Sequence, residues 1–128
     1  MKVLALDFGA ARTGVAVSDP TGTLARPVGV VERAASDAGL AEIRRLVDRE
    51  AAARVVVGMP LTLRGEHGEQ ARETERFLES LRAILDVPVE TFDERFTTTL
   101  AAADAGDAPE DARAAAHLLT SYLEWASR

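Results

Sequence analysis

The chain has 128 residues, no cysteine and a formal net charge of −6; this length fits one compact domain, spanning 1–128, and the composition excludes disulfides and thiolate zinc sites. Because no apolar run is long enough to span a membrane and no signal-peptide core is found, we expect a cytoplasmic protein with no membrane contact. The acidic net charge argues against a protein that coats nucleic acid nonspecifically. It is compatible with a metal-dependent site, because bound cations make the local electrostatic field positive.

The hydrophobic pattern alternates strands and helices after an initial meander, which is typical of an α/β sheet with some antiparallel strands. Strands are predicted at 2–6, 15–18, 27–31, 54–58 and 87–92. Helices are predicted over an amphipathic stretch that includes 40–47, from about 69 to 85, from about 97 to 105, and after Pro109. Ser36 or Asp37 is suited to cap the first of these helices.

The first strand delivers Asp7 to a glycine-containing turn, and a second apolar run follows at once. Gly9 and Gly14 give this turn the freedom to bend tightly and to bring N–H groups close to a ligand. Arg12 lies in the same turn and adds a guanidinium group suited to bidentate contact with phosphate. Such a segment is also common as an ordinary turn, so on its own it leaves the structural and the phosphate-binding interpretations open.

Two further carboxylates are expected near Asp7. If the last predicted strand runs parallel to the first, Asp7 and Glu94 leave the carboxyl ends of neighbouring strands, where open α/β sheets bind ligands. Helical periodicity places Asp111 on the inward face of the final helix, in one stripe with Ala115, Leu118, Tyr122 and Trp125. The aromatic residues of this stripe are therefore expected in the core, and His117, which lies off it, is expected at the surface.

These carboxylates suit a metal site. A buried, unpaired carboxylate is costly, so Asp7, Glu94 and Asp111 are predicted to share a divalent cation. Mg²⁺ or Mn²⁺ suits oxygen ligands from separate elements, and two such ions can activate an attacking water and stabilise the leaving oxygen in phosphodiester hydrolysis. Plainer interpretations also stand: Asp111 is favourable charge in the first turn of a helix, and Glu94 forms a surface ion pair with Arg95.

Four segments together resemble the YqgF/RuvX family. They are DFGAARTGVAVSD, VVVGMPLTLRGEHGEQA, VETFDERFTT and DARAAAHLLTSYL, which follow the family's order and are spread along nearly the whole chain. The resemblance implies an α/β ribonuclease H-like fold, in which helices flank a five-stranded mixed sheet. It also implies an active-site plan similar to that of Holliday junction resolvases.

The resemblance implies roles for individual residues. Asp7, Glu94 and Asp111 would be the catalytic residues that hold Mg²⁺ or Mn²⁺, with Asp93 as a second candidate beside Glu94. The implied substrate-binding residues are Arg12, Arg64, Arg95, Thr97 and Thr98. One departure is the acidic stretch 106–110, where the family often carries lysines and arginines. This difference affects which substrate is bound, and how tightly, more than it affects the cleavage reaction.

Members of this family are assigned to ribosomal RNA maturation, so the resemblance implies a metal-dependent endonuclease that processes the 5′ end of precursor 16S rRNA in ribosome biogenesis. Two alternatives stay open: a Holliday junction resolvase that cleaves four-way DNA junctions as a homodimer, and a noncatalytic module that binds nucleic acid or ribosomal precursors. The segment DFGAARTGVAV also resembles the phosphate-binding hairpin of actin-like and sugar-kinase phosphotransferases. Those enzymes bind nucleotide between two such domains, and 128 residues supply only one.

Overall fold

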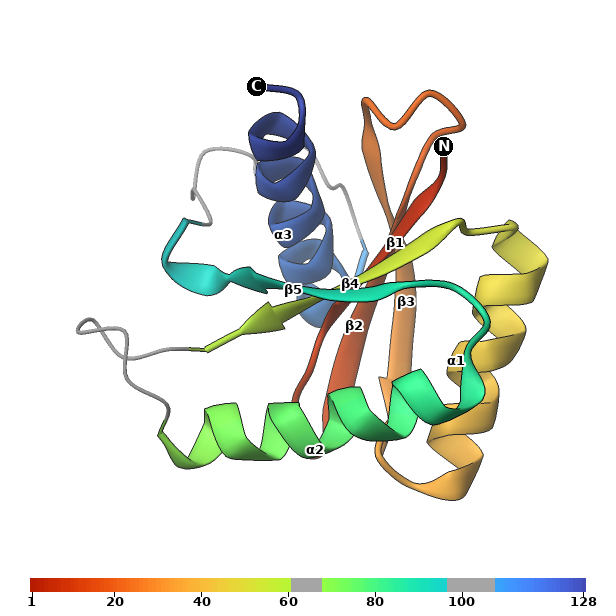
Figure 1. Cartoon of the computed structure of the whole chain (residues 1–128), viewed down its shortest axis with the longest axis vertical. Helices are drawn as coiled ribbons and strands as arrows, with labels where there is room; N and C mark the ends of the chain where they lie inside the picture. Colours follow the sequence, from red (N-terminus) through yellow and green to blue (C-terminus); the bar gives the residue numbers. More distant parts are fainter. Residues whose placement is uncertain (61–67, 97–107) are drawn as a thin grey trace.

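The structure, a computed structural model, describes residues 1–60, 68–96 and 108–128 (Figure 1). The elements in these ranges are β1 (Val3–Asp7), β2 (Arg12–Ser18), β3 (Ala25–Glu32), α1 (Asp37–Glu50), β4 (Arg54–Met59), α2 (Glu69–Ile84), β5 (Val89–Asp93), the 3₁₀ turn η1 (Glu94–Phe96) and α3 (Glu110–Ala126). The helix predicted at 97–105 lies outside the described residues. Within the described ranges, no helix is long and apolar enough to cross a membrane.

The strands form one five-stranded sheet in the order β3-β2-β1-β4-β5. β2 pairs antiparallel with both β1 and β3, whereas β4 pairs parallel with both β1 and β5. The predicted five-stranded mixed sheet is therefore confirmed. The expectation that β1 and β5 are neighbours is wrong, because the crossover through α2 leaves β4 between them.

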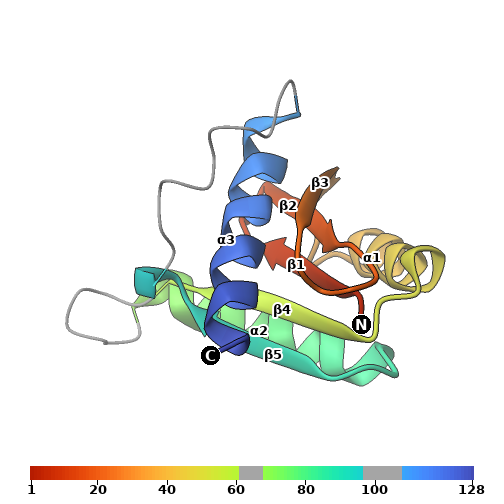
Figure 2. The same cartoon turned by 90° about the horizontal axis from the view of Figure 1, so that it is seen from above.

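Helices cover both faces of this sheet, with α1 and α2 on one face and α3 on the other (Figure 2). The side chains of β1 alternate between the two faces, as the geometry of a strand requires. Leu4 and Leu6 pack on the side of α1 and α2, whereas Val3 and Ala5 pack against α3. The run 55–57 of β4 is fully buried because both of its faces are covered.

The helix starts follow local capping chemistry. Ser36, rather than Asp37, caps α1, because its Oγ accepts a hydrogen bond from the backbone N–H of Gly39 at 3.1 Å. α3 begins directly after Pro109, as the sequence predicts. This start places Asp111 in the first turn of α3.

The far end of α3 departs from the expected packing. Tyr122 is buried as predicted, but Trp125, which we expected in the core, is 53% exposed. Tyr122 closes the core here, because its hydroxyl accepts a hydrogen bond from Arg54 at 3.1 Å and donates one to Glu90 at 3.2 Å. Trp125 lies beyond this closing layer, and its indole is therefore left at the surface.

Candidate active site

Asp7 and Glu94 meet at one edge of the sheet. Asp7 is the last residue of β1, and Glu94 is the first residue of η1, directly after β5. Their side chains are hydrogen-bonded to each other, with the Glu94 carboxyl as the donor and the Asp7 carboxylate as the acceptor. Both line a cavity of about 300 Å³, whose other walls are Ala114, His117 and Leu118 of α3.

Gly58 allows these two carboxyl groups to meet across the strand that separates them. Gly58 lies in β4, where it pairs with Phe92 of β5. A Cβ atom at this position would lie 2.7 Å from Oε1 and 3.0 Å from Cγ of Glu94. The Glu94 side chain therefore passes over the bare backbone of Gly58 to reach Asp7.

Burial and mutual repulsion keep a proton on this pair. Burial, the charge of Asp7 and the hydrogen bond to Asp7 together raise the pKa of Glu94 to about 7. Burial also raises the pKa of Asp7, and the nearby charge of Asp111 adds to this effect, while the hydrogen bond from Glu94 opposes it. The two carboxyl groups thus resist carrying two negative charges at neutral pH in the absence of a cation.

Asp111 approaches this edge from α3. Gly14 of β2 pairs with Asp7 in the sheet, and a Cβ atom at Gly14 would lie 1.8 Å from the backbone oxygen of Asp111. The first turn of α3 therefore rests directly on the strand beside Asp7. The Asp111 carboxylate forms an ion pair with Arg12, in which Arg12 Nε lies 3.2 Å from Asp111 Oδ2. The Arg12 side chain is 66% exposed, so its guanidinium group lies at the mouth of this region.

The donor chemistry of these residues fits a divalent cation. Asp7, Glu94 and Asp111 offer only carboxylate oxygens, which Mg²⁺ and Mn²⁺ prefer. A cation would also relieve the repulsion that raises the pKa of Asp7 and Glu94. Among the described residues, no three ligand-type side chains lie close enough together to form a metal site as they stand. Asp7 and Glu94 are in contact, whereas the Asp111 carboxylate is turned to Arg12.

The neighbouring carboxylate, Asp93, has a different partner. Arg95 Nε lies 2.9 Å from Asp93 Oδ2, and the Arg95 backbone N–H donates to Asp93 Oδ1 at 2.9 Å. The hydrogen bond from the Arg95 side chain lowers the pKa of Asp93. Of the two acidic residues considered at this turn, it is therefore Glu94 that pairs with Asp7. Three other residues with predicted roles, Arg64, Thr97 and Thr98, lie outside the described residues.

His117 lines the cavity, although its position off the apolar stripe predicts a surface residue. Its ring is partly buried in the cavity wall, and Nε2 has no hydrogen-bond partner among the described residues. Ala114, His117 and Leu118 follow the three-and-four spacing of one helix face. The inward stripe of α3 is therefore wider than predicted, and this spacing is the signal that would have included His117.

Comparisons with known proteins find relatives that match most of the chain. The family model described as "RuvX: Holliday junction resolvase" matches residues 1–125. A Rubrobacter xylanophilus protein named "Putative pre-16S rRNA nuclease" is 46% identical over an alignment 131 positions long, which covers 96% of this chain and 92% of the relative. A protein of the same name from Chloroflexus aggregans is 46% identical over 99 residues, which cover 77% of this chain and 70% of the relative.

A solved structure shares the fold. The structure described as "T. thermophilus RuvC in complex with Holliday junction substrate" is 18% identical, with a TM-score of 0.71. The match covers 99% of this chain and 95% of that one. The predicted ribonuclease H-like fold is thereby confirmed.

Proposed function

The chain belongs to the RuvX family, and on this premise we propose that it is a cytoplasmic nuclease that processes the 5′ end of precursor 16S rRNA in ribosome biogenesis. The observation that carries this proposal is the hydrogen-bonded Asp7–Glu94 pair, which lines a cavity within reach of Asp111. Paired carboxylates with raised pKa values are typical of sites that perform chemistry. The names of the relatives support the choice of RNA.

Asp7, Glu94 and Asp111 are the residues that we assign to hold Mg²⁺ or Mn²⁺. A divalent ion bound there would supply the positive charge that acidifies a water molecule and stabilises the charge developing on the phosphate. For these residues to hold the ion, Glu94 would release its proton to water and Asp111 would turn from Arg12.

Arg12 then has a second role. A phosphodiester approaching this edge meets the negative charge of Asp7 and Asp111, and Arg12 is the cation that lies in contact with one of them. Once Asp111 has turned away, the exposed guanidinium group of Arg12 is suited to hold a phosphate oxygen. We assign the other predicted contacts to the substrate backbone as well, namely Arg64, Arg95, Thr97 and Thr98.

A second candidate function is the cleavage of four-way DNA junctions. The description of the matching family model favours it. Paired cuts in two strands need two coordinated sites, so this function requires a homodimer, whereas one site suffices to trim RNA.

One experiment separates these functions. The purified protein is incubated with Mn²⁺ and either a 5′-extended precursor 16S RNA or a four-way DNA junction, each end-labelled. Asp7→Asn is the inactive variant, and Asp86→Asn is its matched control, because Asp86 is exposed and precedes β5 at the opposite edge of the sheet.

RNA cleavage that Asp7→Asn abolishes and Asp86→Asn preserves supports the proposal. Paired cuts in the junction alone support the resolvase. If neither substrate is cut above the Asp7→Asn background, the proposal fails, and a noncatalytic module that binds nucleic acid takes its place.

A further inference from the structure

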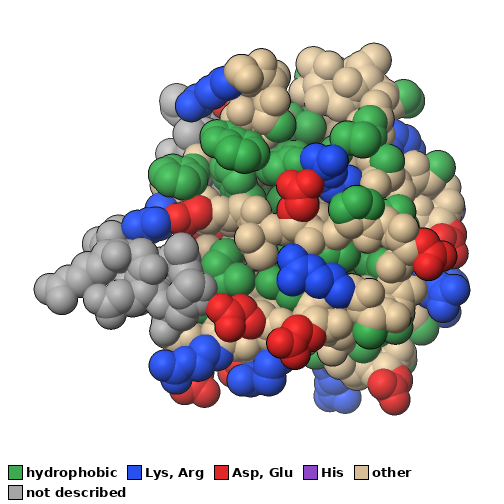
Figure 3. All heavy atoms as spheres, viewed as in Figure 1, with side chains coloured by type: hydrophobic (Ala, Val, Ile, Leu, Met, Phe, Trp, Pro, Cys, Tyr) green, Lys and Arg blue, Asp and Glu red, His purple; other side chains and the backbone are tan. Residues whose placement is uncertain are grey.

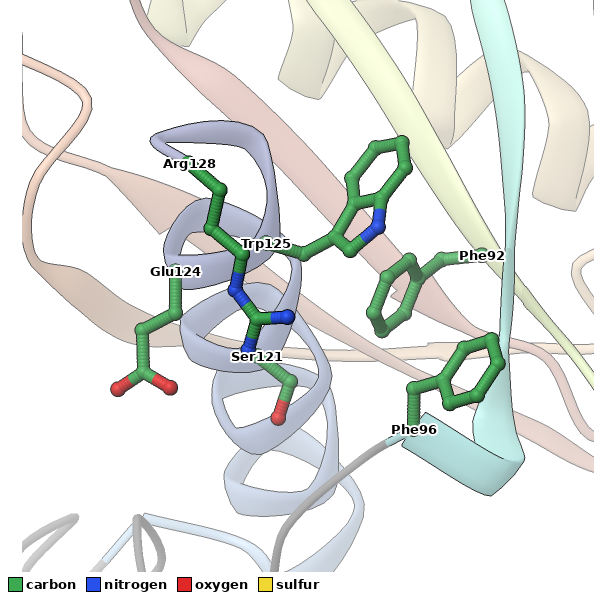
Figure 4. A pocket seen from close by; sticks show the side chains of 6 residues that line it. All are labelled: Phe92, Phe96, Ser121, Glu124, Trp125 and Arg128. Atoms are coloured by element: carbon green, nitrogen blue, oxygen red, sulfur yellow. The ribbon is translucent and has the colours of Figure 1, made fainter.

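A second hollow, of about 310 Å³, lies between α3 and β5 (Figure 4). We call it the aromatic hollow; its lining residues are Phe92, Phe96, Ser121, Glu124, Trp125 and Arg128. The rings of Phe92, Phe96 and Trp125 gather on one side of it (Figure 4). The ring centroids of Phe92 and Trp125 are 5.9 Å apart, and those of Phe92 and Phe96 are 6.2 Å apart.

The rings of Phe96 and Trp125 both contact Phe92, yet each leaves much of its surface exposed. Phe92 and Tyr122 are 5% and 3% exposed and close the core beneath the hollow. Phe96 and Trp125 are 61% and 53% exposed. Hydrophobic side chains gather on the molecular surface where α3 and η1 meet (Figure 3). Because exposed aromatic side chains in a cluster mark binding surfaces, this pair calls for a ligand.

The aromatic hollow adjoins the candidate active site along two chain segments. In η1, Glu94 lines the catalytic cavity and Phe96, two residues later, lines the hollow. In α3, Leu118 lines the cavity and Ser121 lines the hollow, a separation of about 4.5 Å along the helix axis. A strand held at the carboxylates thus has a neighbouring nucleotide within reach of the hollow.

We propose that the aromatic hollow binds one unpaired nucleobase of the substrate strand, next to the phosphodiester held at the carboxylates. Bases of any identity stack on aromatic rings, and such stacking is how proteins bind single strands without strict sequence preference. The hollow is at the small end of ligand sites, which suits one planar ring better than a helix or strand of another protein. The guanidinium group of Arg128 at its rim is suited to the adjacent backbone.

This proposal rests on the proposed nuclease function, which gives the position of the scissile bond. It adds a preference for one kind of substrate, an unpaired strand. Bases inside a duplex are stacked on each other and cannot lie on Phe96 or Trp125. The hollow therefore selects an unpaired segment, as at the single-stranded extension of a precursor RNA, over a continuous double helix.

Trp125 is the only tryptophan of the chain, so its fluorescence reports on the hollow directly. We would titrate the full-length protein in EDTA, where no cleavage interferes, with a short single-stranded RNA and with the same RNA annealed to its complement. The single strand is expected to quench Trp125 emission with saturation, and the duplex is expected to bind at least about tenfold more weakly.

Phe96→Ala is the test variant, and it is expected to weaken single-strand binding about tenfold or more. Leu24→Ala is the matched control, because Leu24 is also highly exposed but lies in the connection between β2 and β3. It should bind as the wild type does. Asp7→Asn should keep the quenching while losing any cleavage.

The two proposals fail in different ways. If the wild type and Phe96→Ala cut precursor RNA equally and the single strand leaves Trp125 emission unchanged, the hollow is not a base site although the nuclease function stands. If quenching saturates and depends on Phe96 but no RNA is cut, the base site stands and the nuclease function fails. If Trp125 emission instead follows protein concentration and Phe96→Ala turns a dimer into a monomer in sedimentation, a second copy of the chain covers the hollow, and the base site is overturned.

Discussion

A side chain at Gly14 would occupy the same space as the backbone of Asp111: a Cβ atom at Gly14 would lie 1.8 Å from the Asp111 carbonyl oxygen. Gly14 is paired with Asp7 in the sheet, so this contact fixes the distance between the strand that carries one carboxylate and the helix that carries another. Gly14 thus lies in β2 and not in the turn where the sequence predicts it, and its role is to let α3 pack closely on the strand.

Gly14→Ala is expected to push α3 from the sheet. Because the contact is with backbone, which cannot move aside as a flexible side chain can, we expect a loss of about 1–3 kcal/mol in the free energy of unfolding. The displacement of Asp111 should lower the cleavage rate about a hundredfold. Urea unfolding and the cleavage assay measure the two effects. Gly29→Ala is the control, since a Cβ atom there would meet nothing within 4 Å; equal losses in both variants would contradict this explanation.

Gly58→Ala is expected to separate activity from stability. Its Cβ atom would displace the flexible end of Glu94, 2.7 Å away, so the fold should lose less stability than in Gly14→Ala. Glu94 would no longer reach Asp7, and cleavage should fall about tenfold or more. The pKa of Glu94, followed by NMR, should fall from about 7 toward its ordinary value. An unchanged pKa would show that Glu94 does not depend on the gap at Gly58.

The stability of the cation-free protein should depend on pH through Glu94. Its pKa is about 7 in the folded protein, against 4.5 as the ordinary value, so folding favours the protonated form. The stabilisation is complete below pH 4.5 and is lost as the pH rises to about 7. Urea unfolding in EDTA over this range should show the free energy of unfolding decreasing. In Glu94→Gln this decrease should shrink; a wild-type slope in that variant would assign the effect to another group.

Divalent cations should stabilise the wild type. A ligand that binds only the folded state adds about 2.7 kcal/mol at a concentration of 100 times its Kd. We therefore expect Mn²⁺ to raise the melting temperature of the wild type and of Asp86→Asn, but to leave Asp7→Asn nearly unchanged. A rise of the same size in Asp7→Asn would place the cation elsewhere.

The hydrophobic pattern was sufficient to predict the strands, their mixed directions and the start of α3. It could not order the parallel strands, because periodicity reports which faces of a strand are buried but not which strand lies beside it. The prediction that Asp7 and Glu94 lie close together is correct, but its premise, that their strands are neighbours, is wrong. The two side chains meet because Gly58 has no side chain on the strand between them. Trp125 was misplaced because a helical stripe continues past the point where Tyr122 has already closed the core.

The position of α3 couples the packing of the core to the position of one of the carboxylates. This helix covers Val3 and Ala5 on one face of the sheet, and it also carries Asp111. A fluctuation that lifts α3 from the sheet exposes the core and, in the same event, moves Asp111 away from Asp7 and Glu94. Heating should therefore end cleavage and expose the core in the same transition, because both the packing and the position of Asp111 depend on α3 lying on the sheet.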